Sequence, residues 1–275
     1  MSDEITRVFS DVHFGDRASR VRRLAQLGPL LEGVSQLALN GDTLDTRVGP
    51  APAQTAADHA EVMVFFRQAV PAVTYVTGNH DPDVSMSHVM DFAAGQVCAT
   101  HGDIFFENIV PWGRDAALIT QRIEAERRSL PENAPPSLEQ QFGIWRRVAA
   151  SIPQRHQSER HGLKYAWRFA ADTVWPPTRF LRILRAWKVE PGLAATWARQ
   201  HRPAANFILT GHTHRPGIWQ MPGGLTVINT GSFCPPLGGY AVDISSTRLV
   251  VREVTALRGA FQPGRSVAEF ALAAG

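Results

Sequence analysis

The stretch Phe207-Ile208-Leu209-Thr210-Gly211-His212-Thr213-His214 says more about the fold than any other in the chain. Its apolar run predicts a buried strand that ends at a glycine, and two histidines follow at once. Side chains at positions i and i+2 of an extended segment point to the same side, so both imidazoles can reach one site beyond the strand end. Alone, the pattern is a weak signal.

Four more short apolar runs end in polar side chains of the same kinds. They place Asp11 and His13 after residues 5–9, Asp42 after 37–39, Asn79, His80 and Asp81 after 73–76, and His101 after 96–100. Taken singly, each could be a turn with an exposed polar residue. Because ligand sites in layered α/β folds form at the carboxyl ends of strands, we expect these side chains to meet.

The kinds of donor atom indicate a metal centre. Carboxylate, amide and imidazole groups together favour two divalent cations, with Mn²⁺ as the first choice and Fe²⁺ or Zn²⁺ as alternatives, over calcium or a thiolate-bound structural zinc. Two metal ions about 3.5–4 Å apart are a recurring device for phosphoester hydrolysis. His80 titrates near neutrality and could protonate a leaving group, with Asp81 to orient it.

In this order, the five clusters resemble the calcineurin-like metallophosphoesterase superfamily over roughly residues 5–102 and 206–244. The resemblance implies that Asp11, His13, Asp42 and His214 hold one metal ion, and that Asp42, Asn79, His101 and His212 hold a second. It also implies that a hydroxide bridging the metals attacks phosphorus, while His80, oriented by Asp81, protonates the leaving oxygen.

The same resemblance implies an α/β fold, a four-layer α-β-β-α sandwich of two mixed sheets with a helical cap insertion. We expect a catalytic domain over 1–111 and 203–255, a cap over 112–202, and a loosely held Gly/Pro/Ala-rich tail over 256–275. The spacing of apolar residues predicts helices over Arg17–Leu27 and roughly Asp58–Ala69.

Composition separates the expected cap from the rest of the chain. Residues 112–202 carry 16 Lys and Arg against 8 Asp and Glu, and six of the seven tryptophans. Phe180, Ile183, Leu184 and Trp187 follow helical spacing, with arginines on the other faces. Such a helix packs as an ordinary cap helix, the commoner outcome, or contacts a lipid or membrane surface. Aromatic residues among basic ones can also bind nucleic acid.

The insertion is similar in place to that of the UDP-2,3-diacylglucosamine pyrophosphatases, in which a helical cap covers acyl chains. His101-Gly102-Asp103 precedes it, and Arg215-Pro216 follows His214. This resemblance implies a lipid-linked pyrophosphate substrate. The chain departs from that family at His80, where arginine is usual, which favours a generic phosphatase or phosphodiesterase that uses an imidazole acid. A nuclease or cyclic-nucleotide phosphodiesterase is an alternative, and so is a non-catalytic binding scaffold.

Two cysteines, Cys98 and Cys234, give no disulfide framework and fit a reducing compartment. The first residues lack the apolar stretch of a signal peptide, and no run of 18 apolar residues occurs. We therefore expect a cytoplasmic protein that could touch a membrane surface through its cap.

Overall fold

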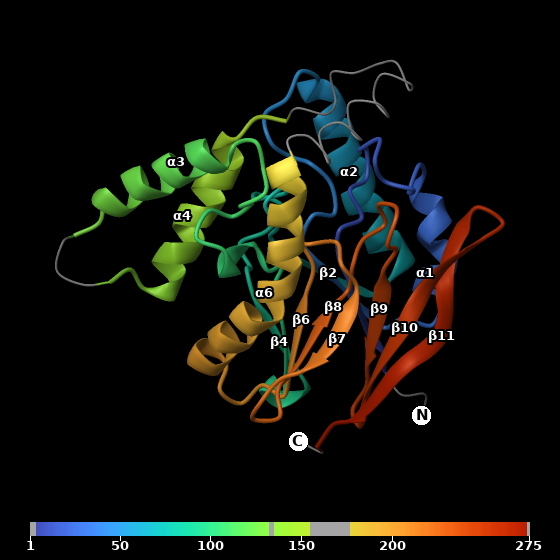
Figure 1. Ribbon diagram of the computed structural model, residues 1–275. Coiled ribbons are helices and arrows are strands. Elements are labelled where there is room, and N and C mark those ends of the chain that lie inside the picture. The colour runs from blue at the N-terminus through green and yellow to red at the C-terminus, as the bar shows by residue number, and fades with distance from the viewer. Residues whose placement is uncertain (1–3, 132–134, 155–176, 274–275) are drawn as a thin grey trace.

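A computed structural model describes residues 4–131, 135–154 and 177–273. Two mixed sheets pack face to face with helices on both outer sides, which confirms the predicted fold class (Figure 1). Part of the expected cap, including Trp167 and Trp175, lies outside the described residues. None of the described helices has the length and apolar character that crossing a bilayer requires.

The first sheet has six strands in the order β11-β10-β9-β1-β2-β3. They are β1 (Thr6–Phe9), β2 (Gln36–Asn40), β3 (Ala72–Val76), β9 (Tyr240–Ile244), β10 (Arg248–Leu257) and β11 (Ala260–Ala271). Strands β1, β2 and β3 pair in parallel, whereas β9, β10 and β11 join by antiparallel pairs. The three parallel strands therefore end at one edge, and the segments with Asp11, Asp42 and Asn79 follow them there.

The second sheet has five strands in the order β4-β5-β6-β8-β7. They are β4 (Met90–Phe92), β5 (Val97–Ala99), β6 (Phe207–Thr210), β7 (Gly217–Gln220) and β8 (Thr226–Asn229). Strands β5, β6 and β8 are parallel. His101 follows β5, and His212 and His214 follow β6, so this sheet also delivers its polar residues at the ends of parallel strands.

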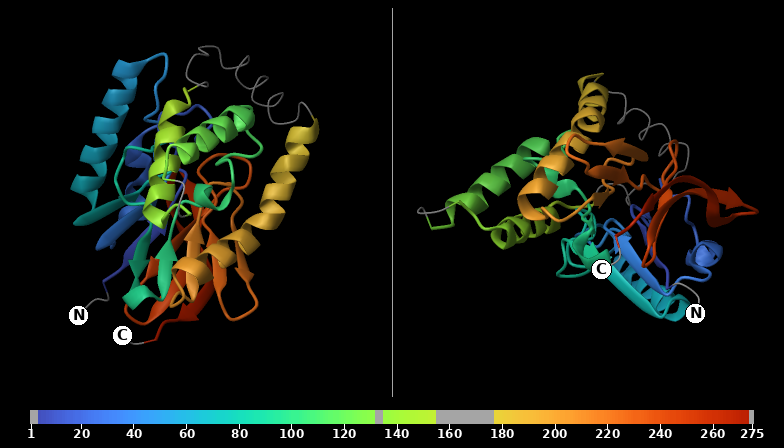
Figure 2. Two further views of the ribbon diagram at one scale, coloured as in Figure 1. Left: turned by 90° about the vertical axis from the view of Figure 1, so that its left-hand side faces the viewer. Right: turned by 90° about the horizontal axis from the view of Figure 1, so that it is seen from below.

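Helices cover the outer faces of both sheets (Figure 2). They are α1 (Gly28–Leu31), α2 (Pro52–Ala69), α3 (Ala116–Arg128), α4 (Leu138–Ser151) and α6 (Pro177–His201), with short 3-10 turns η1 (Leu24–Leu27), η2 (Ala93–Gly95) and η3 (Asp103–Phe105). Helix α2 contacts β3 of the first sheet, and α6 contacts β6 and β8 of the second. Helices α3 and α4 pack against each other around their own apolar cluster.

Alternation along the strands builds the layers. In β1, Val8 packs between the two sheets and Phe9 packs under the helices of the first sheet. In β6, Leu209 packs between the sheets and Ile208 packs under α6. Neighbouring strand residues point to opposite faces, so strands that are apolar on both faces are buried on both sides. This double burial fixes the register and hence the position of each strand end.

Two expectations from the sequence are wrong. The segment expected as a loose tail from residue 256 instead forms β11, which pairs with β10 through a turn where Arg258 and Gly259 both have positive φ. Pro263 lies beside a register shift in that hairpin, which hid the strand pattern. Helix Arg17–Leu27 is reduced to η1, because Asp16 and Ser19 side chains bind nearby backbone N–H groups.

Candidate metal centre

The backbone that carries the predicted ligands is unusual. Five of the seven ligands have left-handed φ angles between 49° and 65°, and they are Asp11, His13, Asp42, His212 and His214. Such conformations cost of order 1–3 kcal/mol each for residues other than glycine, and they cluster at functional sites. Gly41 adds a close approach, because a Cβ there would lie 2.4 Å from the His101 ring. These loops therefore adopt locally unfavourable backbone conformations that bring the predicted ligands together.

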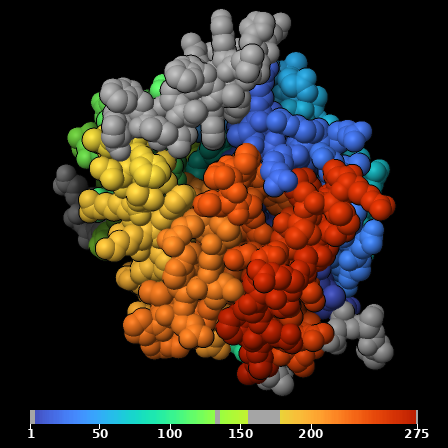
Figure 3. Space-filling model, turned by 45° about the vertical axis from the view of Figure 1, so that its right-hand side comes forward, coloured from blue at the N-terminus to red at the C-terminus, as the bar shows by residue number. Residues whose placement is uncertain are grey.

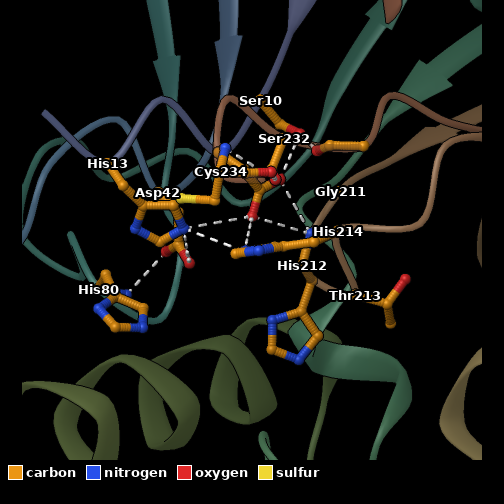
Figure 4. A network of polar contacts seen from close by, with 12 residues as sticks. Ser10, His13, Asp42, His80, Gly211, His212, Thr213, His214, Ser232 and Cys234 are labelled. Atoms are coloured by element: carbon orange, nitrogen blue, oxygen red, sulfur yellow. Dashed lines mark hydrogen bonds and ion pairs between the residues drawn. The ribbon is translucent and has the colours of Figure 1, made fainter. Parts of the chain in front are cut away.

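The first group of ligands converges from three loops (Figure 4). Asp11 Oδ1 lies 3.1 Å from His214 Nε2 and 3.7 Å from His13 Nε2. The two Nε2 atoms are only 3.1 Å apart. Asp42 Oδ2 is 3.8 Å from His13 Nε2 and joins this group to the next. Nitrogen and carboxylate lone pairs that meet in this way are the donor set of a divalent cation.

The second group contains buried donor atoms that the protein leaves unused. Asp42 Oδ2 lies 3.3 Å from His101 Nε2, without hydrogen-bond geometry. His101 Nε2 and Asn79 Oδ1 have no hydrogen-bond partner among the described residues. Leaving a buried polar atom unsatisfied costs about 1–3 kcal/mol. A cation would satisfy both atoms, so the residues fit a metal ion.

Two imidazoles of this second group are oriented from behind. His101 Nδ1 lies 3.0 Å from the carbonyl of Asn40, and His212 Nε2 lies 2.8 Å from the carbonyl of Ile109. Each carbonyl accepts a hydrogen bond from the N–H of the nitrogen that it faces. The opposite nitrogen of each ring is then a lone-pair donor, which is the usual arrangement for metal-binding histidine.

The pKa shifts of Asp11 and His13 show that the cluster stabilises positive charge next to its carboxylates. Burial would raise the pKa of Asp11, but the nearby His101 and His214 rings outweigh it and hold that pKa well below its usual range. Burial would lower the pKa of His13, yet Asp11 and Asp42 raise it to about 9. A proton on His13 therefore compensates the negative charge of Asp11 and Asp42. Divalent cations would compete for the same positions.

His80 is positioned by a residue that the sequence analysis missed. His80 Nδ1 lies 3.1 Å from Asp45 Oδ2, and Arg47 forms two hydrogen bonds to Asp45, at 2.9 and 2.7 Å. Arg47 Nη2 is also 2.8 Å from His80 Nδ1. Burial and the Arg47 charge lower the pKa of His80. The available signal was a second aspartate three residues after Asp42, in the same loop.

Asp81 does not orient His80, which corrects the sequence expectation. Its carboxylate accepts hydrogen bonds from the backbone N–H groups of Gly78, Asp42 and Thr43, at 2.9, 2.9 and 2.7 Å. Asp81 is fully buried. It ties the loop after β3 to the loop after β2. Its effect on the site is therefore to hold the backbone of Asp42 in place.

Glu190 links helix α6 to the loop of His212 and His214. This residue is 1% exposed, and its carboxylate accepts hydrogen bonds from Thr210, Thr213 and Asn229 at 2.8, 2.8 and 2.7 Å. Asn229 also donates to the carbonyl of Gly211 at 2.7 Å. The loop that carries two predicted ligands is thus fastened to α6 by a buried carboxylate, which nothing in the local sequence announced.

The helix is irregular next to this attachment. Pro191 lies inside α6 and has no N–H to donate to the carbonyl of Trp187. Arg215 Nη1 donates to that carbonyl instead, at 3.0 Å. Trp187 Nε1 in turn donates to the carbonyl of Thr213 at 2.8 Å. Two more bonds therefore join the middle of α6 to the loop after β6.

Replacing Glu190 with alanine should lower the free energy of unfolding by at least about 3 kcal/mol, because three buried donors lose their acceptor. Urea denaturation followed by circular dichroism measures the change. The matched control is Glu126→Ala, which removes an exposed pair with Arg147 and should cost less than about 1 kcal/mol. Equal losses in the two variants would show that the Glu190 contacts contribute nothing special.

A cavity of about 380 Å³ opens beside the cluster. Its polar lining includes Asp42, Asn79, His80, His212 and His214. The rest of the lining is largely apolar, with Trp112, Phe180, Ile183, Trp187 and the segment 235–237, and it also contains Arg179. Figure 3 views the face where α6, in yellow, lies beside the segment after β8, in orange. Phe180, Ile183 and Trp187 of the predicted apolar stripe thus face the cavity, and Phe180 remains 44% exposed.

Comparison with known proteins gives only distant similarities. No family model matches the chain, and no curated protein is similar to it in sequence. Among solved structures, an uncharacterised predicted phosphoesterase of Streptococcus pneumoniae shares 16% identity at a TM-score of 0.41, covering 98% of this chain and 99% of that one. A dimetal phosphatase of Danio rerio shares 14% sequence identity at a TM-score of 0.44, with 99% of each chain covered. Vacuolar Protein Sorting 29 of Cryptosporidium parvum shares 11% sequence identity at a TM-score of 0.45, with 98% of each chain covered.

Proposed function

We propose that the chain is a metal-dependent phosphohydrolase that cleaves a phosphodiester or a pyrophosphate. The observation that carries this proposal is the meeting of carboxylate, amide and imidazole donors around two buried atoms, Asn79 Oδ1 and His101 Nε2, that have no partner among the described residues. Asp11, His13, Asp42 and His214 would hold one divalent cation, and Asp42, Asn79, His101 and His212 a second.

The cations, when bound, supply Lewis-acid activation of water and neutralise charge on the phosphoryl oxygens. The chain supplies the proton for the leaving group. The backbone N–H of His80 donates to Asp42 Oδ1 at 2.8 Å, which fixes its imidazole next to the cluster. In our assignment, His80 carries a proton on each ring nitrogen when it acts: Nδ1–H donates to Asp45, Arg47 donates to Asp45 and not to the ring, and Nε2–H gives its proton to the leaving oxygen. Asp45 then holds the ring and stabilises its charged form.

The cavity walls favour a substrate with an apolar group next to its phosphate. A volume of about 380 Å³ is that of a small-molecule site. The apolar wall would hold the alcohol or lipid part while the cluster holds the phosphate. A lipid-linked pyrophosphate meets this description, and so does an alkyl or aryl phosphodiester. Phe180 and Leu181, 44% and 61% exposed, give α6 an apolar surface that could rest on a membrane.

The first test measures metal content and turnover together. Metal-free protein should take up two Mn²⁺ ions per chain and then hydrolyse bis(p-nitrophenyl) phosphate. Mass spectrometry of molecules that copurify with the protein would identify the natural substrate class. A chain that binds no metal and turns nothing over would be a scaffold. Tight, strongly salt-dependent binding of single-stranded nucleic acid without metal would favour a nucleic-acid partner.

Substrate preference tests the apolar wall. Phe180→Ser should lower kcat/KM for a long-chain alkyl phosphodiester by roughly 3- to 10-fold, because contact with part of a phenyl ring is lost. It should leave the methyl ester unchanged. Leu181→Ser is the matched control, since Leu181 is adjacent and exposed but does not line the cavity. Equal effects of Phe180→Ser on both esters would show that the apolar wall does not bind the alkyl chain of the substrate.

A further inference from the structure

Cys234 lies against the first group of metal ligands. Its Sγ and one imidazole nitrogen each of His13 and His214 all lie within 4.8 Å of one another. In Figure 4 the sulfur points to the side where His13 and Asp42 lie. Cys234 is only 7% exposed.

The backbone holds this position firmly. Phe233 donates its N–H to the carbonyl of Asp11 at 3.1 Å, and its own carbonyl accepts from Arg20 at 3.0 Å. The N–H of Cys234 donates to Ser232 Oγ at 3.1 Å. The loop after β8 is therefore bonded directly to the loop that carries two predicted ligands. A thiol fixed at this distance is part of the same cluster.

We propose that Cys234 is a further ligand of the first metal ion, beside Asp11, His13, Asp42 and His214. This inference rests on the proposed metal centre. A thiolate is a soft donor, which favours Zn²⁺, Fe²⁺ or Co²⁺ over Mn²⁺. The second group, with Asp42, Asn79, His101 and His212, offers only oxygen and nitrogen. The centre is therefore asymmetric, with a softer first position and a harder second one.

The charge of the thiol depends on that ion. Burial, together with the carboxylates of Asp16, Asp11 and Asp42, raises the pKa of the Cys234 thiol, so it is neutral in the metal-free protein. A bound divalent cation reverses this preference, because coordination removes the thiol proton outright. Cation binding at the first position thus places one positive ion among the carboxylates and releases one proton from sulfur.

Cobalt spectroscopy tests the sulfur ligand without any activity measurement. Co²⁺-loaded protein should show a thiolate-to-cobalt charge-transfer band in the near ultraviolet. Cys234→Ser should lose the band, whereas Cys98→Ser should keep it. Cys98 is the matched control, because it is fully buried in β5 against the apolar core under α6. Elemental analysis gives the number of bound ions in each protein.

The outcomes separate the two proposals. If neither the wild-type protein nor any variant binds cobalt, the proposed metal centre is wrong. If the wild type binds two ions without the band, or Cys234→Ser retains the band, the centre stands and the role of Cys234 is overturned. In a competition experiment, the wild type should keep one Zn²⁺ in the presence of excess Mn²⁺. In Cys234→Ser, the ratio of Zn²⁺ affinity to Mn²⁺ affinity should fall by about 10-fold or more.

A second measurement needs no variant and covers the case in which Cys234→Ser fails to fold. Alkylation of the wild type by iodoacetamide, read by peptide mass spectrometry, should be slower at Cys234 when Zn²⁺ is bound. Cys98 reports any general change in protein opening in the same sample. Unchanged alkylation of Cys234 in Zn²⁺-loaded protein would contradict coordination by its sulfur.

Discussion

Replacing Asp42 with alanine is expected to abolish hydrolysis and to remove both metal ions. Asp42 Oδ2 lies 3.3 Å from His101 Nε2 in one ligand group and 3.8 Å from His13 Nε2 in the other. It is the only residue that we assign to both cations. Losing a shared ligand removes several kcal/mol of transition-state stabilisation, so kcat/KM should fall by about 10³-fold or more.

The measurement combines elemental analysis with hydrolysis of bis(p-nitrophenyl) phosphate. Circular dichroism should show that Asp42→Ala remains folded, because its neighbours in the core do not change. Asp83→Ala is a suitable control, since Asp83 is an exposed carboxylate that contacts Thr46. It should retain two metals and full activity. Substantial turnover by Asp42→Ala with both metals bound would refute the bridging assignment.

Replacing His80 with alanine should leave the metals in place and slow only substrates that need a proton on the leaving group. For an alkyl ester the loss should be about 10²- to 10⁴-fold, the usual contribution of a general acid. For a p-nitrophenyl ester it should be less than about 10-fold, because that leaving group departs without protonation. Rates for a series of leaving groups, at saturating metal, give the comparison.

Asp45→Asn provides the partner experiment. Because Asp45 contacts His80 Nδ1, its loss should reproduce the His80→Ala pattern in weaker form. Asp81→Asn should behave differently, because Asp81 binds three backbone N–H groups and not the imidazole. We expect lower stability and weaker metal binding from it, for all leaving groups alike. An Asp81→Asn variant with the leaving-group pattern of His80→Ala would return Asp81 to the role first predicted.

The sequence was most informative where side chains follow buried strands. Runs such as 37–39 and 207–209 are apolar on both faces, and this pattern marks strands covered on both sides. Parallel pairing then sends the residues after β1, β2 and β3 to one edge of the first sheet, and those after β5 and β6 to one edge of the second. The approach of Asp42 to His101 depends in addition on how the two sheets pack. The sharp turns of the loop backbone could also be predicted in part, because Gly41 and Gly211 directly precede Asp42 and His212.

The sequence was least informative where a role depends on which atoms face each other. Asp81 is adjacent to His80 in the chain, yet its carboxylate turns to backbone donors, and Asp45 faces the ring instead. Glu190 lies 20 residues or more from its three partners, so only the fold could bring them together. Composition marked residues 112–202 as distinct, but α6 does not follow that boundary, since Ala194 and Trp197 pack with the second sheet.

The attachment of α6 at Glu190 also bears on how such a protein could change during evolution. The second half of the helix is anchored to the sheet and the ligand loop, whereas residues 178–187 carry the apolar wall. If the proposed function holds, mutations at Phe180 and Ile183 would reshape the apolar wall and leave the predicted ligands in place, whereas a change at Trp187 would also disturb the ligand loop. New specificities could then arise at part of the wall without rebuilding the metal centre.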